Sequence, residues 1–577
     1  MRHAIVTGSN ALRVTWWLVL GVFASAVVNG CATSRERITR AQVAGIEKLL
    51  EAHTNRAGPG CVIAIIKDGE IIYERGYGSA NLQYGTPITP LTVFNVASAA
   101  KQFTAMSILL LVKEGTLSLD DDVRKYIPEV PDYGKVITLR RLMHHTSGLR
   151  NYEDLIDMAA WRPEDALTRE HMLHMIARQK ELNFAPGQRY LYCNTGYILL
   201  AEIVARVSGQ SFREFTDRNI FKPLGMTNTH FHDSHTFIVT NGAASYYFHG
   251  NGSYKNAFSN SSVVGGGGLY STVRDLLKWL RNFDHARVGG PQVLKQMHER
   301  GVLNSGKTIP YGGGLFIDRY KGVDIVGHGG GTAGWRSDTI RFPSQGVGLV
   351  LLGNVDTVDN YKVPRQIAEL FLKTKDAPKT NSRASRLIRP ESAALEAFVG
   401  DYELEGFIVT VRVDDKKLMA RAVGQPEVEL VAESENRFLI QENQSRVLFE
   451  RDDNRKVTRL ILEQDGESHP GPRVTLLKPE ELTKQIGDYA GEYYSDELET
   501  SYTIKVRNNE MFVAHPRLAE ASVTPTGIAD KFMGEGWFSF GVVFTRDNDR
   551  TVTGFRLSTD RTQNVLFQRR QETTARN

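Results

Sequence analysis

Ser98 and Lys101, three residues apart, are the first residues in this 577-residue chain whose types and spacing could do chemistry. On a helix, residues three apart share a face, so the lysine nitrogen can reach the serine hydroxyl. A serine hydroxyl is a weak nucleophile until a neighbouring base accepts its proton, and a lysine with a depressed pKa can be that base. The spacing therefore predicts an activated serine nucleophile. An N-capping serine beside a snorkelling lysine is the alternative interpretation.

A tyrosine followed two residues later by an asparagine is the second candidate, and the triplet occurs twice. Residues 192–194 (YCN) follow a Pro-Gly turn and precede an amphipathic helix, whereas residues 254–256 (YKN) lie in a polar loop. We assign the function to Tyr192, because a fixed platform can hold a phenol against the serine, and interpret Tyr254 as part of a surface turn. A phenol near two cationic groups can shuttle protons once its pKa is lowered. Asn194 is expected to orient the lysine and the substrate carbonyl.

A glycine-rich segment that begins with a histidine, residues 328–334 (HGGGTAG), is the third candidate. It follows the apolar residues 325–326, so it is expected to end a strand. Glycines at such a place let a substrate backbone lie close to the chain. A solvated turn residue is the alternative interpretation of His328 taken alone.

The elements that must position these motifs alternate between strands and helices over residues 38–375. Residues 61–73 predict a β-hairpin with Asp-Gly at the turn. Residues 103–113 are apolar on nearly all faces, which predicts a helix buried in the core. Residues 195–208 predict an amphipathic helix, and residues 347–352 a central strand. The pattern is typical of an α/β or α+β domain of enzyme size.

The pattern changes in the C-terminal part of the chain. Residues 376–391 are rich in Lys, Arg, Ser and Pro and poor in large apolar residues, which indicates a linker. Beyond them, short alternating strands with turn residues about every ten positions indicate an all-β structure.

Two pairs of short segments show that this all-β region repeats itself. The matching pairs are residues 398–402 (FVGDY) with 489–493 (YAGEY), and 449–453 (FERDD) with 544–548 (FTRDN). Chance aromatic matches are the alternative. A period of about 90 residues is too long for a solenoid unit and matches a whole small barrel. We therefore predict two related all-β barrels, residues 392–481 and 482–572.

The first 31 residues have the order of a secretory signal, with basic residues, an apolar run over residues 14–28 and a small-residue exit. Gly30 before Cys31 also resembles the lipobox of bacterial lipoproteins, in which the cysteine is lipidated. Cleavage after residues 24–26 (ASA) is the alternative. The run is shorter than the roughly 20 residues that a bilayer needs. We expect an exported protein, in the periplasm or at the outer membrane as a lipoprotein.

Charge and cysteine content limit the remaining functions. The chain has 70 Lys and Arg against 66 Asp and Glu, a net charge of +4, without a concentrated basic tract. Nucleic acid is therefore an unexpected partner. The three cysteines lack the paired C-x-x-C spacing of a zinc or iron–sulfur site and are too few for a disulfide framework. No structural metal is indicated.

Together the three motifs resemble the active site of the penicillin-recognising serine hydrolases, in the branch that contains class C β-lactamases, DD-peptidases, related esterases and D-aminopeptidases. The S-x-x-K, Y-x-N and H-x-G triplets of that family are similar to Ser98/Lys101, Tyr192/Asn194 and His328/Gly330. Further similar strings lie at residues 117–121 (LSLDD), 145–149 (HTSGL), 184–187 (FAPG), 223–226 (PLGM) and 265–269 (GGGGL).

The resemblance implies an antiparallel sheet flanked by helices, beside a helical subdomain, with the active site between them. It implies that Ser98 is acylated while Lys101 and Tyr192 exchange its proton. The backbone N–H groups of Ser98 and Gly331 would form the oxyanion hole, usually the largest electrostatic contribution to acyl transfer. Gly330 and Thr332 would contact substrate. No metal or organic cofactor is needed.

One departure from the family bears on the substrate. Most β-lactamases of the group carry lysine where this chain has His328, which is largely uncharged at neutral pH and would grip a carboxylate less strongly. The family's D-aminopeptidases also have an H-x-G triplet and two C-terminal barrels. We therefore expect an exported serine hydrolase that acts through an acyl-enzyme on a D-amino-acid-containing peptide, amide or small ester. A β-lactamase or DD-carboxypeptidase, and a non-catalytic or covalently acylated binding protein of the cell envelope, are the alternatives.

Overall fold

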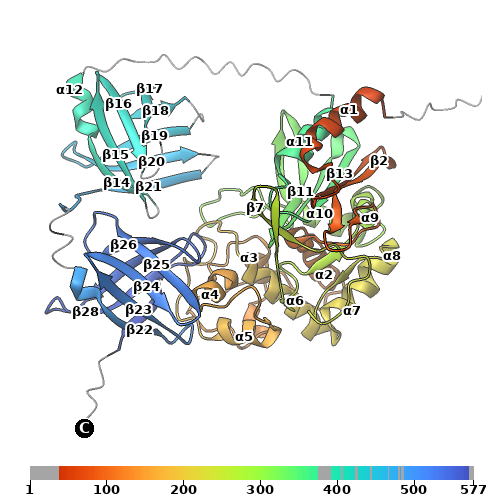
Figure 1. The fold of residues 1–577 in the computed structure, drawn as a ribbon, viewed down its shortest axis with the longest axis horizontal. Coiled ribbons are helices and arrows are strands. Elements are labelled where there is room, and N and C mark those ends of the chain that lie inside the picture. The colour runs from red at the N-terminus through yellow and green to blue at the C-terminus, as the bar shows by residue number, and fades with distance from the viewer. Residues whose placement is uncertain are drawn as a thin grey trace, which may run out of the picture.

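The computed structural model describes residues 38–373 and 392–570, apart from the short segments 405–406, 423–425, 442–444, 465–466, 479–480 and 482–485. The expected signal with Cys31 and the expected linker lie outside the described residues. The described chain forms a mixed helix and sheet unit followed by two closed β-barrels (Figure 1). The fold class expected from the sequence is therefore confirmed.

A six-stranded antiparallel sheet is the centre of the first unit. Its strands, in spatial order, are β10 (Phe316–Tyr320), β11 (Val323–Thr332), β12 (Trp335–Phe342), β13 (Val347–Gly353), β1 (Cys61–Lys67) and β2 (Glu70–Tyr77). The expected hairpin is β1–β2, and its turn residues Asp68 and Gly69 have φ of 49° and 83°, the left-handed pair that a two-residue hairpin turn favours. The expected central strand is β13, which is buried along its whole length.

Both faces of this sheet are buried, which explains the continuous apolar run of β1. Alternate side chains of a strand point to opposite faces. Ile63 and Ile65 therefore pack with Ile46 of α1 (Arg40–Leu49) and Ile367 of α11 (Lys362–Glu369) on one face. Their neighbours Val62, Ala64 and Ile66 belong to the larger core on the other face.

The larger core is formed by helices, with α2 (Lys101–Lys113) and α6 (Asn194–Ser208) packed against each other at its centre. Both expected helices are thus confirmed, and α6 ends at Gly209 with φ of 68°. The other helices of this unit are α3 (Leu139–Met143), α4 (Tyr152–Met158), α5 (Arg169–Ala177), α7 (Phe212–Thr216), α8 (Lys222–Leu224), α9 (Val273–His285) and α10 (Gly290–Met297). Within the described residues, no helix combines the length and the apolar character needed to cross a lipid bilayer.

Three small sheets complete the first unit. They are β3 (Ser79–Asn81) with β4 (Thr86–Pro87), β7 (Tyr246–Gly250) with β8 (Ser253–Asn256), and a three-stranded sheet in the order β5 (Phe94–Asn95), β9 (Leu269–Ser271), β6 (His230–Phe231). Tyr254 of the second Y-x-N triplet lies on β8, where its ring packs edge-on against Phe248 at 5.8 Å.

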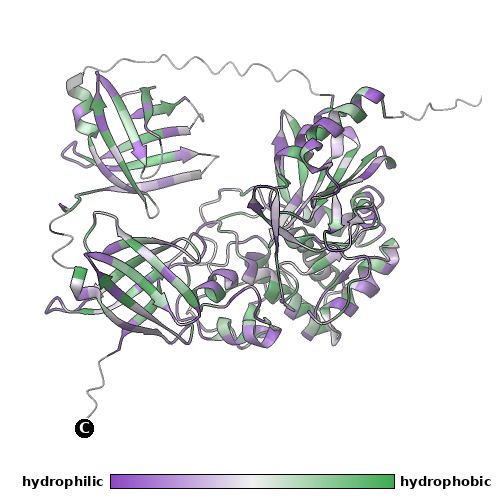
Figure 2. Ribbon diagram, in the orientation of Figure 1, coloured by the Kyte–Doolittle hydropathy of each residue, from purple (hydrophilic) through white to green (hydrophobic). Residues whose placement is uncertain are grey.

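Each barrel closes eight antiparallel strands, and Figure 2 shows hydrophilic and hydrophobic residues alternating along them. The strands of the first barrel, which follows the short helix α12 (Ser392–Leu395), are β14 (Gly400–Leu404), β15 (Phe407–Asp414), β16 (Lys417–Ala422), β17 (Val428–Ala432), β18 (Arg437–Ile440), β19 (Ser445–Arg451), β20 (Val457–Gln464) and β21 (Glu467–Val474). Those of the second are β22 (Gly491–Ser495), β23 (Thr500–Arg507), β24 (Glu510–His515), β25 (Leu518–Pro525), β26 (Lys531–Glu535), β27 (Phe540–Arg546), β28 (Val552–Ser558) and β29 (Val565–Arg569).

The two barrels repeat the same internal contacts, which supports a true repeat in their sequences. The buried Tyr402 donates a hydrogen bond to the carbonyl of Phe398, and Tyr493 donates one to that of Tyr489, both at 2.7 Å. Arg473 and Arg569 close the corresponding barrels by the same contact, from Nη1 to a strand carbonyl at 3.4 Å.

The second barrel packs against α4 and α5 of the first unit (Figure 1). At the centre of this contact the fully buried Arg150 donates to Oε2 of Glu497 at 2.5 Å and to the carbonyls of Gln563 and Asn564 at 2.9 and 3.0 Å. Leu155 and Met158 share a hydrophobic core with the barrel interior. A buried arginine is stable only when its charge is paired and its N–H groups are hydrogen-bonded. Separation of the barrel from the first unit would therefore be strongly unfavourable.

We predict that Glu497→Gln destabilises the protein by about 3 kcal/mol, because it removes the carboxylate 2.5 Å from the buried Arg150 guanidinium and leaves only that of Glu181, at 3.8 Å. Urea unfolding of the full chain measures the effect. The matched control is Asp496→Asn, which removes the exposed ion pair with Lys180 and should change the free energy of unfolding by less than about 1 kcal/mol. Equal stability of the two variants would contradict the prediction.

Candidate active site

Ser98 lies on a strained turn rather than at the start of an α-helix. Residues Ala97–Ala100 form a 3-10 turn that continues into α2 at Lys101. Side chains three residues apart eclipse each other on such a turn, so Lys101 lies directly over Ser98. Ala97 has a left-handed φ of 45°, which is unfavourable for alanine, and its N–H donates to Oδ1 of Asn95 at 2.8 Å.

Lys101 is fully buried and close to the serine. Its Nζ lies 3.0 Å from Oγ of Ser98 and 2.6 Å from the carbonyl oxygen of Gly266. Burial lowers the pKa of Lys101 to about 7, assisted by the positive charge of Arg561 and opposed by the carboxylate of Glu153. At neutral pH a large fraction of the lysine is therefore the free amine, which can accept the serine proton.

The pKa of Tyr192 is shifted in the opposite direction to the sequence expectation. Its hydroxyl is buried without a hydrogen-bond partner, and its ring centroid lies 4.9 Å from Nζ of Lys101. Burial raises the pKa of Tyr192 well above its ordinary value, and the Ser98 hydroxyl opposes only part of that rise. The expectation of a lowered pKa is wrong, because desolvation by burial outweighs the lowering influence of the Ser98 hydroxyl. Tyr192 is a proton donor at neutral pH.

His328 has no ring nitrogen left for a substrate. Its Nε2 pairs with the hydroxyl of Tyr311 at 2.9 Å, and its Nδ1 pairs with the carbonyl oxygen of Gly329 at 2.5 Å. Burial, helped by the charge of Lys101, lowers the pKa of His328 to about 3, so the ring is neutral. The ring of His145 packs against Tyr192, at 4.2 Å between centroids, and against Tyr311. His145, Tyr192, Tyr311 and His328 thus form an uncharged aromatic cluster next to Lys101, which we call the aromatic floor.

Asn194 contacts a carboxylate instead of the lysine. Its Nδ2 donates to Oε2 of Glu153 at 2.6 Å, and its backbone N–H donates to Oδ1 of Asn151 at 2.9 Å. Among the described residues, the hydrogen bonds of Lys101 Nζ go to Ser98 and to the carbonyl of Gly266, so Asn194 does not orient the lysine by a direct hydrogen bond. The asparagine at the start of α6 thus fixes Glu153.

The glycines of the third motif lie on β11, beside the serine turn. A Cβ at Gly330 would come within 2.6 Å of the backbone nitrogen of Ser98, so a larger residue there would displace the turn. Asn360 fixes this strand from behind, since its Nδ2 donates to the carbonyls of Gly330 and Ser337 at 3.1 and 2.6 Å. Gly331 and Thr332 line the same cavity as Ser98, and their oxyanion and substrate roles stay predictions.

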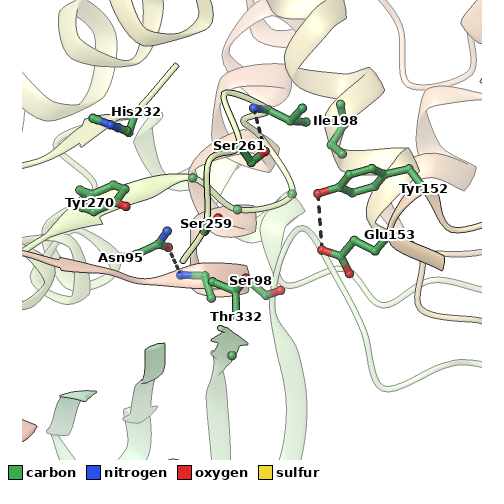
Figure 3. A pocket seen from close by; sticks show the side chains of 16 residues that line it. Asn95, Ser98, Tyr152, Glu153, Ile198, His232, Ser259, Ser261, Tyr270 and Thr332 are labelled. Carbon is green, nitrogen blue, oxygen red and sulfur yellow. Dashed lines mark hydrogen bonds between the residues drawn. The ribbon is translucent and has the colours of Figure 1, made fainter. Parts of the chain in front are cut away.

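The cavity has chemically different sides, which Figure 3 shows around Ser98. Tyr152 and Glu153 lie on one side, and Asn95, His232 and Tyr270 lie on the other. Among the described residues that line the cavity, Glu153 alone carries a formal charge. Sequence reasoning missed it, although it lies only eight positions after the first residue of the HTSGL string.

A loop of the second barrel reaches the same side of the site. Nη2 of Arg561 lies 3.7 Å from Oε2 of Glu153 and 3.3 Å from Oδ1 of Asp154. The hydroxyl of Thr562 accepts from the backbone N–H of Asn151 at 3.1 Å. No local sequence signal could have indicated this, because Arg561 and Glu153 are separated by about 400 residues.

Known proteins resemble the chain in both sequence and fold. A family model described as Beta-lactamase matches residues 42–371. A D-aminopeptidase of Gluconobacter oxydans is 30% identical over 299 residues, 52% of this chain and 56% of that protein, so the chain spans about half the length of this relative. A D-aminopeptidase of Cereibacter sphaeroides is 26% identical over 487 residues, 82% of this chain and 87% of that one. The octameric penicillin-binding protein homologue from Pyrococcus abyssi has a similar fold, with a TM-score of 0.52 at 23% identity over 83% of this chain and 98% of that one.

We predict that kcat/KM for an ester substrate falls about tenfold per pH unit below a midpoint near pH 7. The pKa of Lys101 is about 7, and the protonated amine that forms below it cannot accept the Ser98 proton. A pH–rate profile from pH 5 to 9 measures the midpoint.

The matched control is Asp338→Asn, because burial also raises the pKa of Asp338 to about 7, although this carboxyl pairs with Arg365 at 2.9 Å and lies outside the cavity. The midpoint should persist in that variant. A profile without an acid limb between pH 6 and 8 would contradict the role of the lysine.

Proposed function

This chain belongs to the Beta-lactamase family and is a serine hydrolase, and on that premise we propose that it hydrolyses amides or short peptides that begin with a D-amino acid bearing a free α-ammonium group. The reaction would pass through an acyl-enzyme on Ser98. The sequence relatives named D-aminopeptidase support the proposal.

The observation that carries the proposal is the carboxylate of Glu153 in the cavity of Ser98. Asn194 donates to its Oε2 at 2.6 Å and Arg561 lies 3.7 Å from that oxygen, whereas Oε1 has, among the described residues, only the 3.5 Å contact from the Tyr152 hydroxyl. The side chain is 41% exposed, so Oε1 remains open to a ligand. A fixed carboxylate favours an ammonium group through charge-assisted hydrogen bonds. His328 is neutral and internally paired, so it offers no cation to a substrate carboxylate.

In the proposed mechanism, the free amine of Lys101 takes the proton of Ser98 as Oγ attacks the amide carbon. The backbone N–H groups of Ser98 and Gly331 stabilise the oxyanion that forms. Tyr192 gives its proton to the leaving nitrogen and is reprotonated by the Lys101 ammonium, so the amine departs neutral. Water then attacks the acyl-enzyme by the reverse proton path and releases the amino acid.

We also infer that the protein acts outside the cytoplasm. The order of basic, apolar and small residues before Cys31 supports export, with a lipid on Cys31 where lipobox cleavage occurs. The substrates would then be peptides of the cell envelope.

We predict that Ser98→Ala abolishes covalent labelling by a fluorophosphonate or penicillin probe, because no other hydroxyl lies beside Lys101 in hydrogen-bond range among the described residues. Mass spectrometry of the labelled chain measures the adduct. The matched control is Ser261→Ala, which removes another serine of the same cavity and should keep labelling. Labelling of Ser98→Ala would exclude the assignment, and a stoichiometric adduct without turnover in the unmodified protein would favour a covalent sensor.

We predict that Glu153→Gln raises KM for D-alanine p-nitroanilide about 10- to 100-fold, the range expected for one lost charge-assisted hydrogen bond. The analogue in which a hydroxyl replaces the ammonium group should be nearly unaffected. The matched control is Glu181→Gln, which removes an acid that pairs with Arg556 at 2.9 Å and does not line the cavity. Equal effects on both substrates would contradict an ammonium site at Glu153.

A further inference from the structure

We infer that His145 is a positioning residue that holds Tyr192, the proposed proton donor, beside Ser98 and Lys101. The inference rests on the proposed function, because it takes Tyr192 to protonate the leaving group. It goes further by assigning a task to the histidine that opens the string HTSGL at residues 145–149. His145 touches no substrate in this scheme and acts through Tyr192.

The stretch of chain that carries Tyr192 has no regular secondary structure of its own. Residues 189–193 belong to neither a helix nor a strand, and α6 begins only at Asn194. The hydroxyl of Tyr192 has no hydrogen-bond partner among the described residues, so the phenol does not anchor itself. The position of the proton donor must therefore come from contacts made by its two chain neighbours and by its ring.

His145 supplies both kinds of contact. Its carbonyl oxygen accepts from the backbone N–H of Leu191 at 3.0 Å. Its Nδ1 lies 3.1 Å from both the backbone nitrogen and the carbonyl oxygen of Cys193, so in either tautomer the ring can hydrogen-bond to that residue. The ring packs against that of Tyr192 with 4.2 Å between centroids and 34° between planes. One histidine thus holds the residue before Tyr192, the residue after it and the ring between them.

The histidine is itself fixed to the core of the first unit. It follows α3, and its backbone N–H donates to the carbonyl of Leu142 at 3.3 Å. The hydroxyl of Tyr197 on α6 donates to the carbonyl of Met143 at 2.8 Å, which ties the end of α3 to α6. His145 is only 1% exposed, so packed side chains surround its ring. The contacts to Tyr192 therefore start from a rigid part of the molecule.

Two features of His145 are unfavourable for stability, and the positioning task explains why they are kept. Its φ of 56° lies in the left-handed region, which is uncommon for residues other than glycine. Its Nε2 is buried without a hydrogen-bond partner among the described residues, and such an atom destabilises a protein. Local violations of this kind gather at functional sites, whereas an ordinary core position favours an apolar side chain.

The charge of His145 is compatible with its place next to the lysine. Burial, assisted by the charge of Lys101, lowers the pKa of His145 well below its ordinary value. The ring is therefore neutral near neutral pH and adds no positive charge to the aromatic floor. A neutral ring can hold the phenol of Tyr192 without competing with Lys101 for the proton of Ser98.

The experiment compares kcat/KM for two leaving groups in variants of the full chain. D-alanine p-nitroanilide needs a proton on its leaving nitrogen, whereas the p-nitrophenyl ester of D-alanine expels a phenolate that leaves without one. We expect His145→Phe, which keeps a ring but loses the hydrogen bond to Cys193, to lower kcat/KM about 30- to 100-fold for the anilide and less than about threefold for the ester. His145→Asn should recover most of the anilide activity, because its amide can replace the Nδ1 contact in either tautomer and asparagine tolerates a left-handed φ.

A double-mutant cycle with Tyr192→Phe separates positioning from general damage. Once the phenol is absent, His145→Phe should change the anilide rate by less than about threefold, since the group that it displaces is already gone. His144→Asn is the matched control. It changes the neighbouring buried histidine, which has no hydrogen bond or ring contact with residues 191–193 within the described chain, and it should keep the ratio of anilide to ester activity. Fluorophosphonate labelling of Ser98 verifies that each variant is folded.

Equal losses for the anilide and the ester in His145→Phe, or an undiminished loss in the Tyr192→Phe background, would overturn the positioning role while the proposed function stands. If the unmodified chain turns over neither substrate, the proposed function fails, and the rate of Ser98 labelling then decides on His145 separately. Opening of a penicillin probe protonates its β-lactam nitrogen, whereas a fluorophosphonate expels fluoride without a proton. His145→Phe should slow penicillin labelling about 30-fold or more relative to fluorophosphonate labelling, and equal slowing would overturn the role.

Discussion

The removal of water from Lys101 is the constraint on which the rest of the site depends. Burial in the apolar centre of the unit disfavours the ammonium form of Lys101 and lowers its pKa to about 7. The amine and the ammonium therefore have similar free energies near neutral pH. The aromatic floor excludes water, and the carbonyl of Gly266 accepts one N–H. The strained turn at Ala97 holds the serine under this nitrogen. A site arranged around a lysine that can lose its proton needs neutral neighbours, and His328, Tyr311 and Tyr192 meet that need.

The sequence motifs indicated the local partners correctly because short turns bring them together. Ser98 and Lys101 are one turn apart, and the repeated Gly-x-Tyr segments mark the start of each barrel, so both features are written in neighbouring residues. The expected lowering of the Tyr192 pKa was wrong because the pKa depends on the depth of burial, which the spacing of residues does not record. Glu153 and Arg561 escaped notice for a related reason, since their meeting depends on how the second barrel docks.

The cavity combines one charged side with one neutral side, and this asymmetry gives a substrate a direction. The same asparagine that begins α6 fixes Glu153 and forms part of the second motif, so the proposed ammonium site and that motif share an element. The opposite wall is a small sheet that is independent of the large one.

The contact between Arg150 and Glu497 can form only late in the synthesis of the chain. Arg150 leaves the ribosome about 350 residues before its carboxylate partner, and the loop with Arg561 and Thr562 follows later still. During that interval Glu181, 3.8 Å from Arg150 in the folded protein, is the guanidinium's available carboxylate partner, and the segment with Asn151 and Glu153 lacks its contacts with the loop. The side of the cavity that carries Glu153 is thus among the last parts of the molecule to be completed, when translation is nearly over.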